Sequence, residues 1–200
     1  MKIKRIPAGI YEANCYILID EKTKEVAVID PGGDGEILIK EIDKLDVKVN
    51  CILLTHGHMD HTDAVQDIKD KYNVPVYINP KDKEMMSAGE NVFGAIWEQK
   101  NDGTIEDGDT LKLGELIIKC IETAGHTPGG MCFLVENVVF TGDTLFQGSI
   151  GRTDFVGGSY ELLIKNIKTK LMILPEDTIV LPGHGPESSI KYEKQNNPFL

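Results

Sequence analysis

The stretch Val49–Leu54 is a short apolar run, and it constrains the fold of this chain more than any other segment. A strand that is apolar on both faces must be covered on both sides, as in parallel sheets packed between other layers. Segments with strand and helix patterns alternate around it, in two similar halves of the chain. We therefore predict an α/β fold. Two facing sheets with helices outside them fit this order, although the pattern alone does not choose that architecture.

Local patterns also predict where the individual elements lie. Strands are expected at Lys2–Ile6, Asn14–Ile19, Glu25–Ile29, Val49–Leu54, Val76–Ile78, Thr110–Leu113, Leu116–Glu122, Met131–Val135, Val138–Thr141 and Thr178–Leu181. Helices are expected at Glu36–Leu45, from near Asp60 to Tyr72, at Tyr160–Met172 and from near Pro186, with a helical or irregular stretch from Lys81 to about Gln99. No linker or internal repeat is visible, so we expect one domain over residues 1–200.

Charge and apolar patterning exclude several classes of protein. The net charge is −11 and the charges are scattered, so we expect no nucleic-acid partner. No apolar run approaches the roughly 18 residues that a membrane helix needs. The N-terminal stretch lacks the apolar core of a secretory signal. We therefore expect a cytoplasmic protein with no membrane partner, and the oligomeric state stays open.

The four cysteines point to no metal or disulfide framework. They form no Cys-x-x-Cys pair, and each lies in an apolar, strand-like run. We expect them to be reduced and buried, as small apolar side chains. They are Cys15, Cys51, Cys120 and Cys132.

All five histidines lie in polar, glycine-rich loops that directly follow predicted strands. The four loops are THGHMDH (55–61), TAGHTPGG (123–130), TGDTLF (141–146) and LPGHGP (181–186). Loops at strand ends are where a rigid scaffold presents functional groups. A single histidine is usually structural, but five of five in such loops indicate a shared site.

The side chains in these loops are metal ligands by type. Imidazole and carboxylate groups together suit zinc, iron or manganese. His56 and His58 are two residues apart on an extended segment and can point the same way, whereas Asp60 and His61 follow at the turn into a helix. Five histidines with Asp60 and Asp143 are too many donors for one tetrahedral ion. They fit two ions that share a carboxylate and a bridging hydroxide, about 3.5–4 Å apart.

The order of these donors resembles the metallo-β-lactamase superfamily. The motif is His56-x-His58-x-Asp60-His61, followed by His126, Asp143 and His184. The resemblance spans nearly the whole chain, from ANCYILID and AVIDPGG to EKQNNPFL, and implies an αββα sandwich with metals at the sheet edge between its halves. It also implies two divalent metal ions, with zinc expected and iron or manganese as alternatives. The implied ligands are His56, His58 and His126 for the first metal, Asp60, His61 and His184 for the second, and Asp143 as the bridge.

Other residues narrow the position within the superfamily. Zinc β-lactamases lack the bridging Asp found here as Asp143, so we expect them to resemble this chain less. Flavodiiron reductases usually carry Glu where this chain has His58, and the acidic charge argues against the nucleases. The stretch GSIGRTDFVGGS (148–159) resembles the glyoxalase II-like hydrolases, also called hydroxyacylglutathione hydrolases, in their short bacterial form. Persulfide dioxygenases carry a related GRTDF.

The end of the chain departs from full-length glyoxalase II. That enzyme adds a C-terminal helical domain that supplies much of its glutathione contact, and here only 16 residues follow His184. We expect that domain to be absent, which leaves the thiol half of the substrate open. Arg152 falls where glyoxalase II has a basic substrate-contacting residue and would bind a substrate carboxylate. The alternative is that Arg152 pairs with Asp154 and stabilises the loop.

The resemblance implies an enzyme that hydrolyses a small acyl thioester. A metal-bridging hydroxide would attack the carbonyl carbon, with Asp143 holding both metals and Asp60 orienting the nucleophile. The thiolate is a good leaving group, so no protein acid is required. The rival interpretation is a mononuclear iron persulfide dioxygenase that uses the positions of His56, His126 and Asp143. A metal-stapled binding module is a third and weaker interpretation, because structural sites tend to be closed and give no reason for seven ligands around two ions.

Overall fold

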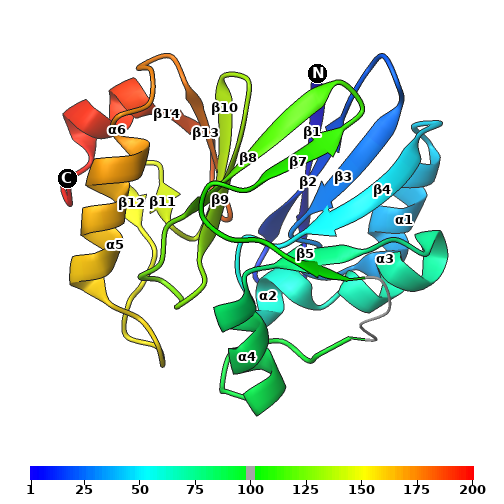
Figure 1. Ribbon diagram of the computed structural model, residues 1–200, viewed down its shortest axis with the longest axis horizontal. Coiled ribbons are helices and arrows are strands. Elements are labelled where there is room, and N and C mark those ends of the chain that lie inside the picture. The colour runs from blue at the N-terminus through cyan, green and yellow to red at the C-terminus, as the bar shows by residue number, and fades with distance from the viewer. Residues whose placement is uncertain (98–101) are drawn as a thin grey trace.

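The computed structural model describes residues 1–97 and 102–200. Two six-stranded sheets face each other, with α1 and α3 outside the first and α5 and α6 outside the second (Figure 1). The first sheet has the order β1-β2-β3-β4-β5-β6 and the second β14-β13-β10-β9-β8-β7. This arrangement is the predicted αββα sandwich.

The strands of the first sheet are β1 (Lys2–Ala8), β2 (Ala13–Ile19), β3 (Glu25–Ile29), β4 (Lys48–Leu53), β5 (Val76–Ile78) and β6 (Gly103–Thr104). Those of the second are β7 (Thr110–Leu113), β8 (Leu116–Glu122), β9 (Met131–Val135), β10 (Val138–Gly142), β13 (Ile179–Pro182) and β14 (Ser188–Ser189). A small hairpin joins β11 (Leu145–Phe146) to β12 (Ser149–Ile150). The helices are α1 (Gly35–Asp43), α2 (Met59–Thr62), α3 (Val65–Tyr72), α4 (Pro80–Ala88), α5 (Tyr160–Asn166), a π-helical segment (Ile167–Leu171) and α6 (Ile190–Asn196).

Three apolar layers explain why strands of this composition stack in this way. Alternate residues of a strand point to opposite faces. In β2, Leu18 joins the layer between the sheets, and Ile17 joins the layer under α1 and α3. The third layer packs the outer face of the second sheet against α5, where Leu163 is fully buried. Because both faces of each sheet are covered, the central strands read as continuous apolar runs.

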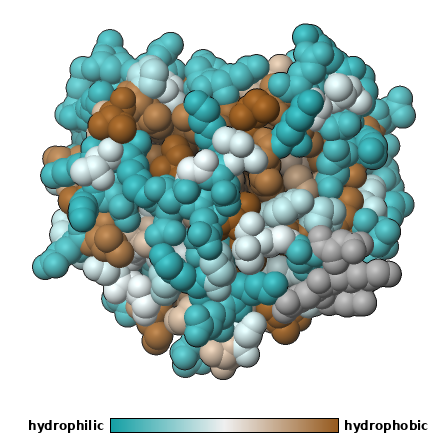
Figure 2. Space-filling model, in the orientation of Figure 1, coloured by the Kyte–Doolittle hydropathy of each residue, from teal (hydrophilic) through white to brown (hydrophobic). Residues whose placement is uncertain are grey.

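The four cysteines are free and buried, which confirms the prediction for them. Burial raises the pKa of Cys51 to about 12, so this thiol stays protonated. Among the described residues, no helix combines the length and the apolar character that crossing a membrane requires. The face of the molecule in Figure 2 is mostly hydrophilic, with apolar residues showing between the polar ones.

Several predicted elements differ in the structure. The helix expected from Asp60 to Tyr72 is two helices, because the Ala64 N–H donates to the Pro31 carbonyl (3.0 Å) and leaves the helical pattern. The last helix begins at Ile190, not near Pro186, because β14 first pairs with β13. The helix predicted to reach Met172 changes to π-helical geometry at Ile167.

Four strands of two residues each were not predicted, because two residues are too few to show a periodicity. These strands are β6, β11, β12 and β14. The stretch expected from Lys81 to Gln99 is helical in α4, which starts at Pro80 with an Asn79 cap and ends at Ala88, and is irregular from there to Trp97. Glu98 and Gln99, the last two residues of that stretch, lie outside the described residues.

Candidate metal centre

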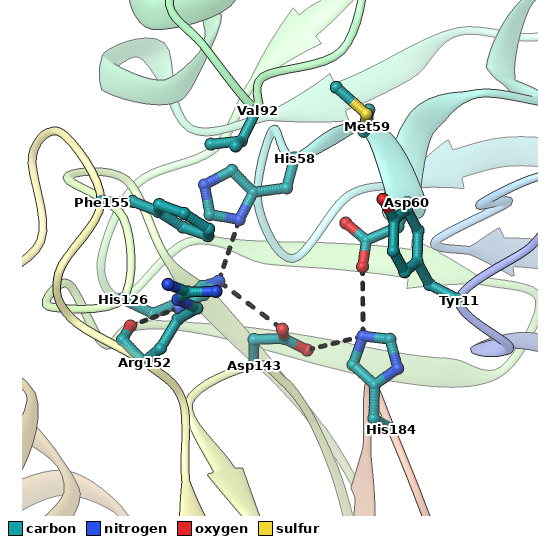
Figure 3. Close-up of a pocket in the computed structure, with 10 residues that line it drawn as sticks. All are labelled: Tyr11, His58, Met59, Asp60, Val92, His126, Asp143, Arg152, Phe155 and His184. Atoms are coloured by element: carbon teal, nitrogen blue, oxygen red, sulfur yellow. Dashed lines mark hydrogen bonds and ion pairs between the residues drawn. The ribbon is translucent and has the colours of Figure 1, made fainter.

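The four histidine- and aspartate-bearing loops meet at one end of the two sheets. The strands β3, β4 and β5 run parallel, as do β10 and β13, so their carboxyl ends lie at common edges. The loop after β4 turns into α2, the loop after β8 comes from the second sheet, and β10 and β13 each end at the site (Figure 3). These ends carry all seven predicted ligands: His56, His58, Asp60, His61, His126, Asp143 and His184.

Three buried imidazoles form the first group. Ligand atoms of His56, His58 and His126 all lie within 4.8 Å of one another. The His58 Nδ1 and His126 Nε2 atoms are 3.0 Å apart. His56 Nε2 is buried and makes no hydrogen bond with any described residue. Buried polar atoms are seldom left unpaired, so this arrangement suits a bound cation.

The second group is more open and combines a carboxylate with two imidazoles. Asp60, His61 and His184 again place one ligand atom each within 4.8 Å of the others. His184 Nε2 lies 3.2 Å from Asp60 Oδ2. The side chains of Asp60 and His184 are 22% and 29% exposed, whereas His61 is fully buried. This group therefore faces the surface and could exchange a ligand with solvent.

Asp143 lies between the two groups and offers one oxygen to each. Its Oδ2 is 3.6 Å from His126 Nε2, and its Oδ1 is 3.3 Å from His61 Nε2. Asp143 Oδ1 and His61 Nε2 are both buried, yet neither makes a hydrogen bond with any described residue. Two buried, unpaired polar atoms at this separation suit a cation bound by both. The structure thus brings the seven predicted donors together as two groups around one carboxylate.

The imidazoles of the first group are neutral, which is the form that binds metals. Burial lowers the pKa of His56 well below its usual range. Burial and the neighbouring His126 lower the pKa of His58 to about 3. Burial likewise lowers the pKa of His126.

Carboxylates dominate the electrostatics of the second group. Burial by itself would lower the pKa of His61, but Asp143 and Asp30 raise it well above its usual range. The hydrogen bond with Asp60 raises the pKa of His184. Burial by itself would raise the pKa of Asp143, but the surrounding imidazoles hold it well below its usual range. Asp143 is therefore a carboxylate at neutral pH, and metal binding competes with the protonation of His61 and His184.

Asp30 orients imidazoles of both groups, and the sequence did not single it out as a site residue. Its Oδ2 accepts from His61 Nδ1 (3.0 Å) and from Thr55 Oγ1 (2.6 Å). The Thr55 hydroxyl in turn accepts from His56 Nδ1 (3.0 Å). These bonds place the protons on Nδ1 and leave both Nε2 atoms free to bind metal. The only signal in the sequence is that Asp30 ends a strand in AVIDPGG, in the manner of the other donors.

His126 is held in the same way by the chain itself. Its Nδ1 donates to the backbone carbonyl of Arg152 (2.7 Å), which leaves Nε2 facing the site. No side-chain pattern could reveal a backbone acceptor, because any residue provides one.

Replacing Asp30 with asparagine should lower the affinity for metal about 10–100-fold, as is usual when a partner of a metal-binding imidazole is lost. The measurement is competition for Zn²⁺ with a chromogenic chelator. Thr55→Val is the matched variant, because it removes only the link to His56 and should weaken one of two binding steps. Wild-type affinity in Asp30→Asn would show that the hydrogen bonds do not set the imidazole orientation.

A cavity of about 400 Å³ opens over both groups. Besides five of the donors, the residues that line it are Tyr11, Met59, Val92, Arg152 and Phe155 (Figure 3). Val92 has a φ of 70°, which is strained for a β-branched residue and is a feature often found beside functional sites. The pocket thus joins a metal-ligand floor to mainly apolar walls.

Arg152 shows both features that the sequence suggested for it. It lines the cavity, and its guanidinium forms two hydrogen bonds with Asp154, at 2.8 and 2.7 Å. The guanidinium also lies 3.8 Å from the centroid of the Phe155 ring. Both charged side chains are exposed, so their pairing is weak and a substrate carboxylate can compete for the guanidinium. Contact with substrate stays a prediction.

Known proteins resemble this chain over its full length. A hydroxyacylglutathione hydrolase, GloC, from Haemophilus influenzae is 40% identical over all of this chain and 98% of its own. A structure of TTHA1623 in a di-iron-bound form has a TM-score of 0.88 at 30% identity and covers 98% of this chain and 100% of that one.

A third similar protein bears on the expected distance from β-lactamases. The structure of BLEG-1, named as a B3 metallo-beta-lactamase, has a TM-score of 0.86 at 36% identity and covers 100% of this chain and 99% of that one. By its name, this protein is an exception to the expectation that β-lactamases resemble the chain less. The model of the metallo-beta-lactamase superfamily matches residues 8–184. The two facing sheets and the arrangement of the donors agree with this match. The chain therefore belongs to the metallo-beta-lactamase superfamily.

Proposed function

We propose that the protein is a dinuclear metal-dependent hydrolase of small acyl thioesters, of the glyoxalase II-like type. The observation that carries the proposal is the pairing of two three-donor groups around Asp143 under an open cavity. A structural metal site is usually closed, whereas a catalytic site keeps a position for water or substrate. The name of the 40% identical relative supports hydroxyacyl thioesters as the substrate class.

The donors in this site suit zinc, which we propose as the metal, with iron as the alternative to test. His56, His58 and His126 would hold one ion, and Asp60, His61 and His184 the other, with Asp143 shared. When bound, such ions activate water at neutral pH and polarise a carbonyl oxygen.

The protein's own residues would bind and orient the substrate. Tyr11, Val92 and Phe155 form walls that exclude water from one side of the thioester, and Arg152 can bind a carboxylate of either half. Asp60 reaches into the cavity and can accept a hydrogen bond from the attacking water. Every histidine is already among the donors, so none remains as a general acid. A thioester needs none, because the pKa of a cysteine-type thiol is only about 8.5, so the thiolate leaves without prior protonation.

A panel of acyl thioesters tests the proposal. The protein is purified without added metal and analysed for bound metal. It is then assayed with S-lactoylglutathione and other thiol carriers in the presence of zinc, iron or manganese. Two metal equivalents with thioester hydrolysis would support the proposal.

Two other outcomes would overturn it. One iron equivalent with oxygen uptake on a persulfide would identify a dioxygenase. Faster cleavage of a β-lactam than of every thioester would instead identify a β-lactamase, the class for which BLEG-1 is named.

A further inference from the structure

Asp82, on α4, is a fully buried carboxylate outside the seven donors. Its Oδ2 accepts from the Gly57 N–H (2.9 Å), and its Oδ1 accepts from the Gly129 N–H (2.6 Å). Burying a carboxylate is costly unless its oxygens are hydrogen-bonded, so this position has a specific task.

The two bonds join the loops that carry the first metal group. Gly57 lies between His56 and His58, on the loop that follows β4 in the first sheet. Gly129 lies three residues after His126, on the loop that follows β8 in the second sheet. The carboxylate therefore links the two sheets at the point where His58 Nδ1 and His126 Nε2 approach to 3.0 Å.

Close packing leaves these loops little freedom to move relative to α4. A Cβ on Gly129 would lie 2.8 Å from Asp82 Oδ1 and 2.9 Å from the Asp82 backbone nitrogen. A Cβ on Gly57 would lie 3.1 Å from the side chain of Met86 on α4 and 3.0 Å from the Phe93 ring. At Gly129 any side chain would push the loop away from the carboxylate, and at Gly57 it would have to displace the neighbouring side chains by a few tenths of an ångström.

The start of α4 is also tied to the second sheet. The Asn79 side chain caps the helix by accepting from the Lys81 N–H (3.0 Å), and its amide donates to Glu122 Oε2 (3.3 Å) at the end of β8. Asp82 is thus carried by a helix whose own position is fixed against β8.

We infer that Asp82 is a positioning residue that sets the spacing of His58 and His126 by holding Gly57 and Gly129 at one carboxylate. The inference rests on the proposed metal centre. The acidic residue acts through the backbone of the loops and touches neither substrate nor metal. Asparagine at this position keeps one acceptor and points an N–H₂ group at the other loop, so one of the two amides loses its partner.

The test is the affinity of Asp82→Asn for Zn²⁺, measured by chelator competition in the full chain. We expect the first group to bind about 10–100-fold more weakly, and the second group to be unchanged. A His184→Ala background, in which the second group lacks a donor, assigns the remaining tight site to the first group. Amide hydrogen exchange in the metal-free protein adds a readout, with faster exchange expected at Gly57 or Gly129.

Asp20→Asn is the matched control. Asp20 is also buried and joins backbone N–H groups of Lys22 (3.0 Å) and Glu115 (2.6 Å), which connects the two sheets at their opposite end. It should lower the melting temperature without changing the affinity for Zn²⁺. An equal loss of affinity in Asp20→Asn, or an unchanged affinity in Asp82→Asn, would overturn the inference.

Two further results keep the outcomes separate. If Asp82→Asn does not fold, Gly129→Ala displaces the same loop while retaining the carboxylate, and it should weaken the first group in the same way. If the wild-type protein fails to bind two Zn²⁺ ions, the proposed function fails, whereas normal wild-type binding with normal Asp82→Asn binding contradicts only the role of Asp82.

Discussion

Replacing Asp143 with asparagine should reduce kcat/KM for an acyl thioester by on the order of 10³-fold and bring bound metal below two equivalents. Asp143 offers one oxygen to each group, with Oδ2 toward His126 and Oδ1 toward His61. Its pKa is held well below the usual range by the imidazoles, so the native side chain is charged at neutral pH. Asparagine preserves the shape but removes the charge and turns an N–H₂ group toward one of the groups.

Steady-state kinetics and metal analysis of the same preparation check this expectation. Asp63→Asn is a suitable control, since Asp63 is an exposed carboxylate three residues after Asp60 and belongs to neither donor group. It should retain both metals and near wild-type activity. Full activity with two metals in Asp143→Asn would exclude Asp143 as the shared ligand.

Removing the metals should abolish thioester hydrolysis and lower the melting temperature while leaving the secondary structure intact. The three apolar layers do not depend on the site, so circular dichroism should change little. Metal at 100 times its Kd adds about 2.7 kcal/mol to the free energy of unfolding. For a chain of this length that corresponds to roughly 5–10 °C. Calorimetry before and after chelation, and again after addition of Zn²⁺, measures the difference.

The difference in melting temperature between the metal-bound and the metal-free protein should grow as the pH rises from 6 to 8. In the metal-free protein, neighbouring carboxylates raise the pKa of His61 and a hydrogen bond raises that of His184. A group whose pKa is higher in the folded than in the unfolded protein stabilises the fold at pH values below its unfolded-state pKa. This stabilisation is lost as the pH rises through the folded-state pKa. Metal binding requires both imidazoles to be neutral, so its affinity rises over the same range. A metal-dependent gain that is constant with pH would contradict these proton exchanges.

Local patterns were enough to predict much of the fold. The bounds expected for β3, β5, β7, β8 and β9 agree with the structure, because these strands are long enough for alternation or a continuous apolar run to show. The two-residue strands and the break before α3 could not be predicted, because they depend on partners elsewhere in the chain. One such partner is the Pro31 carbonyl, which accepts from the Ala64 N–H and interrupts the helix there.

The donors of the candidate site were visible in the sequence, and the residues that orient them were not. Histidines are rare and cluster in loops, so their residue type and position after strands single them out. Asp30 and Asp82 are two of many acidic residues, and only the fold shows that one bonds to His61 and the other to two loop amides.

Residue type and short-range pattern were therefore enough to identify the side chains that can bind metal and most of the segments that become strands. The division of the donors into two groups around Asp143, the free nitrogens of His56, His61 and His126, and the bonds between the loops came from the packed fold. Apart from the bond between Thr55 and His56, these features arise from hydrogen bonds between residues 25 or more positions apart, such as Asp30 with Thr55 and Gly57 with Asp82. Contacts at such separations depend on how the two sheets pack, which no local pattern records.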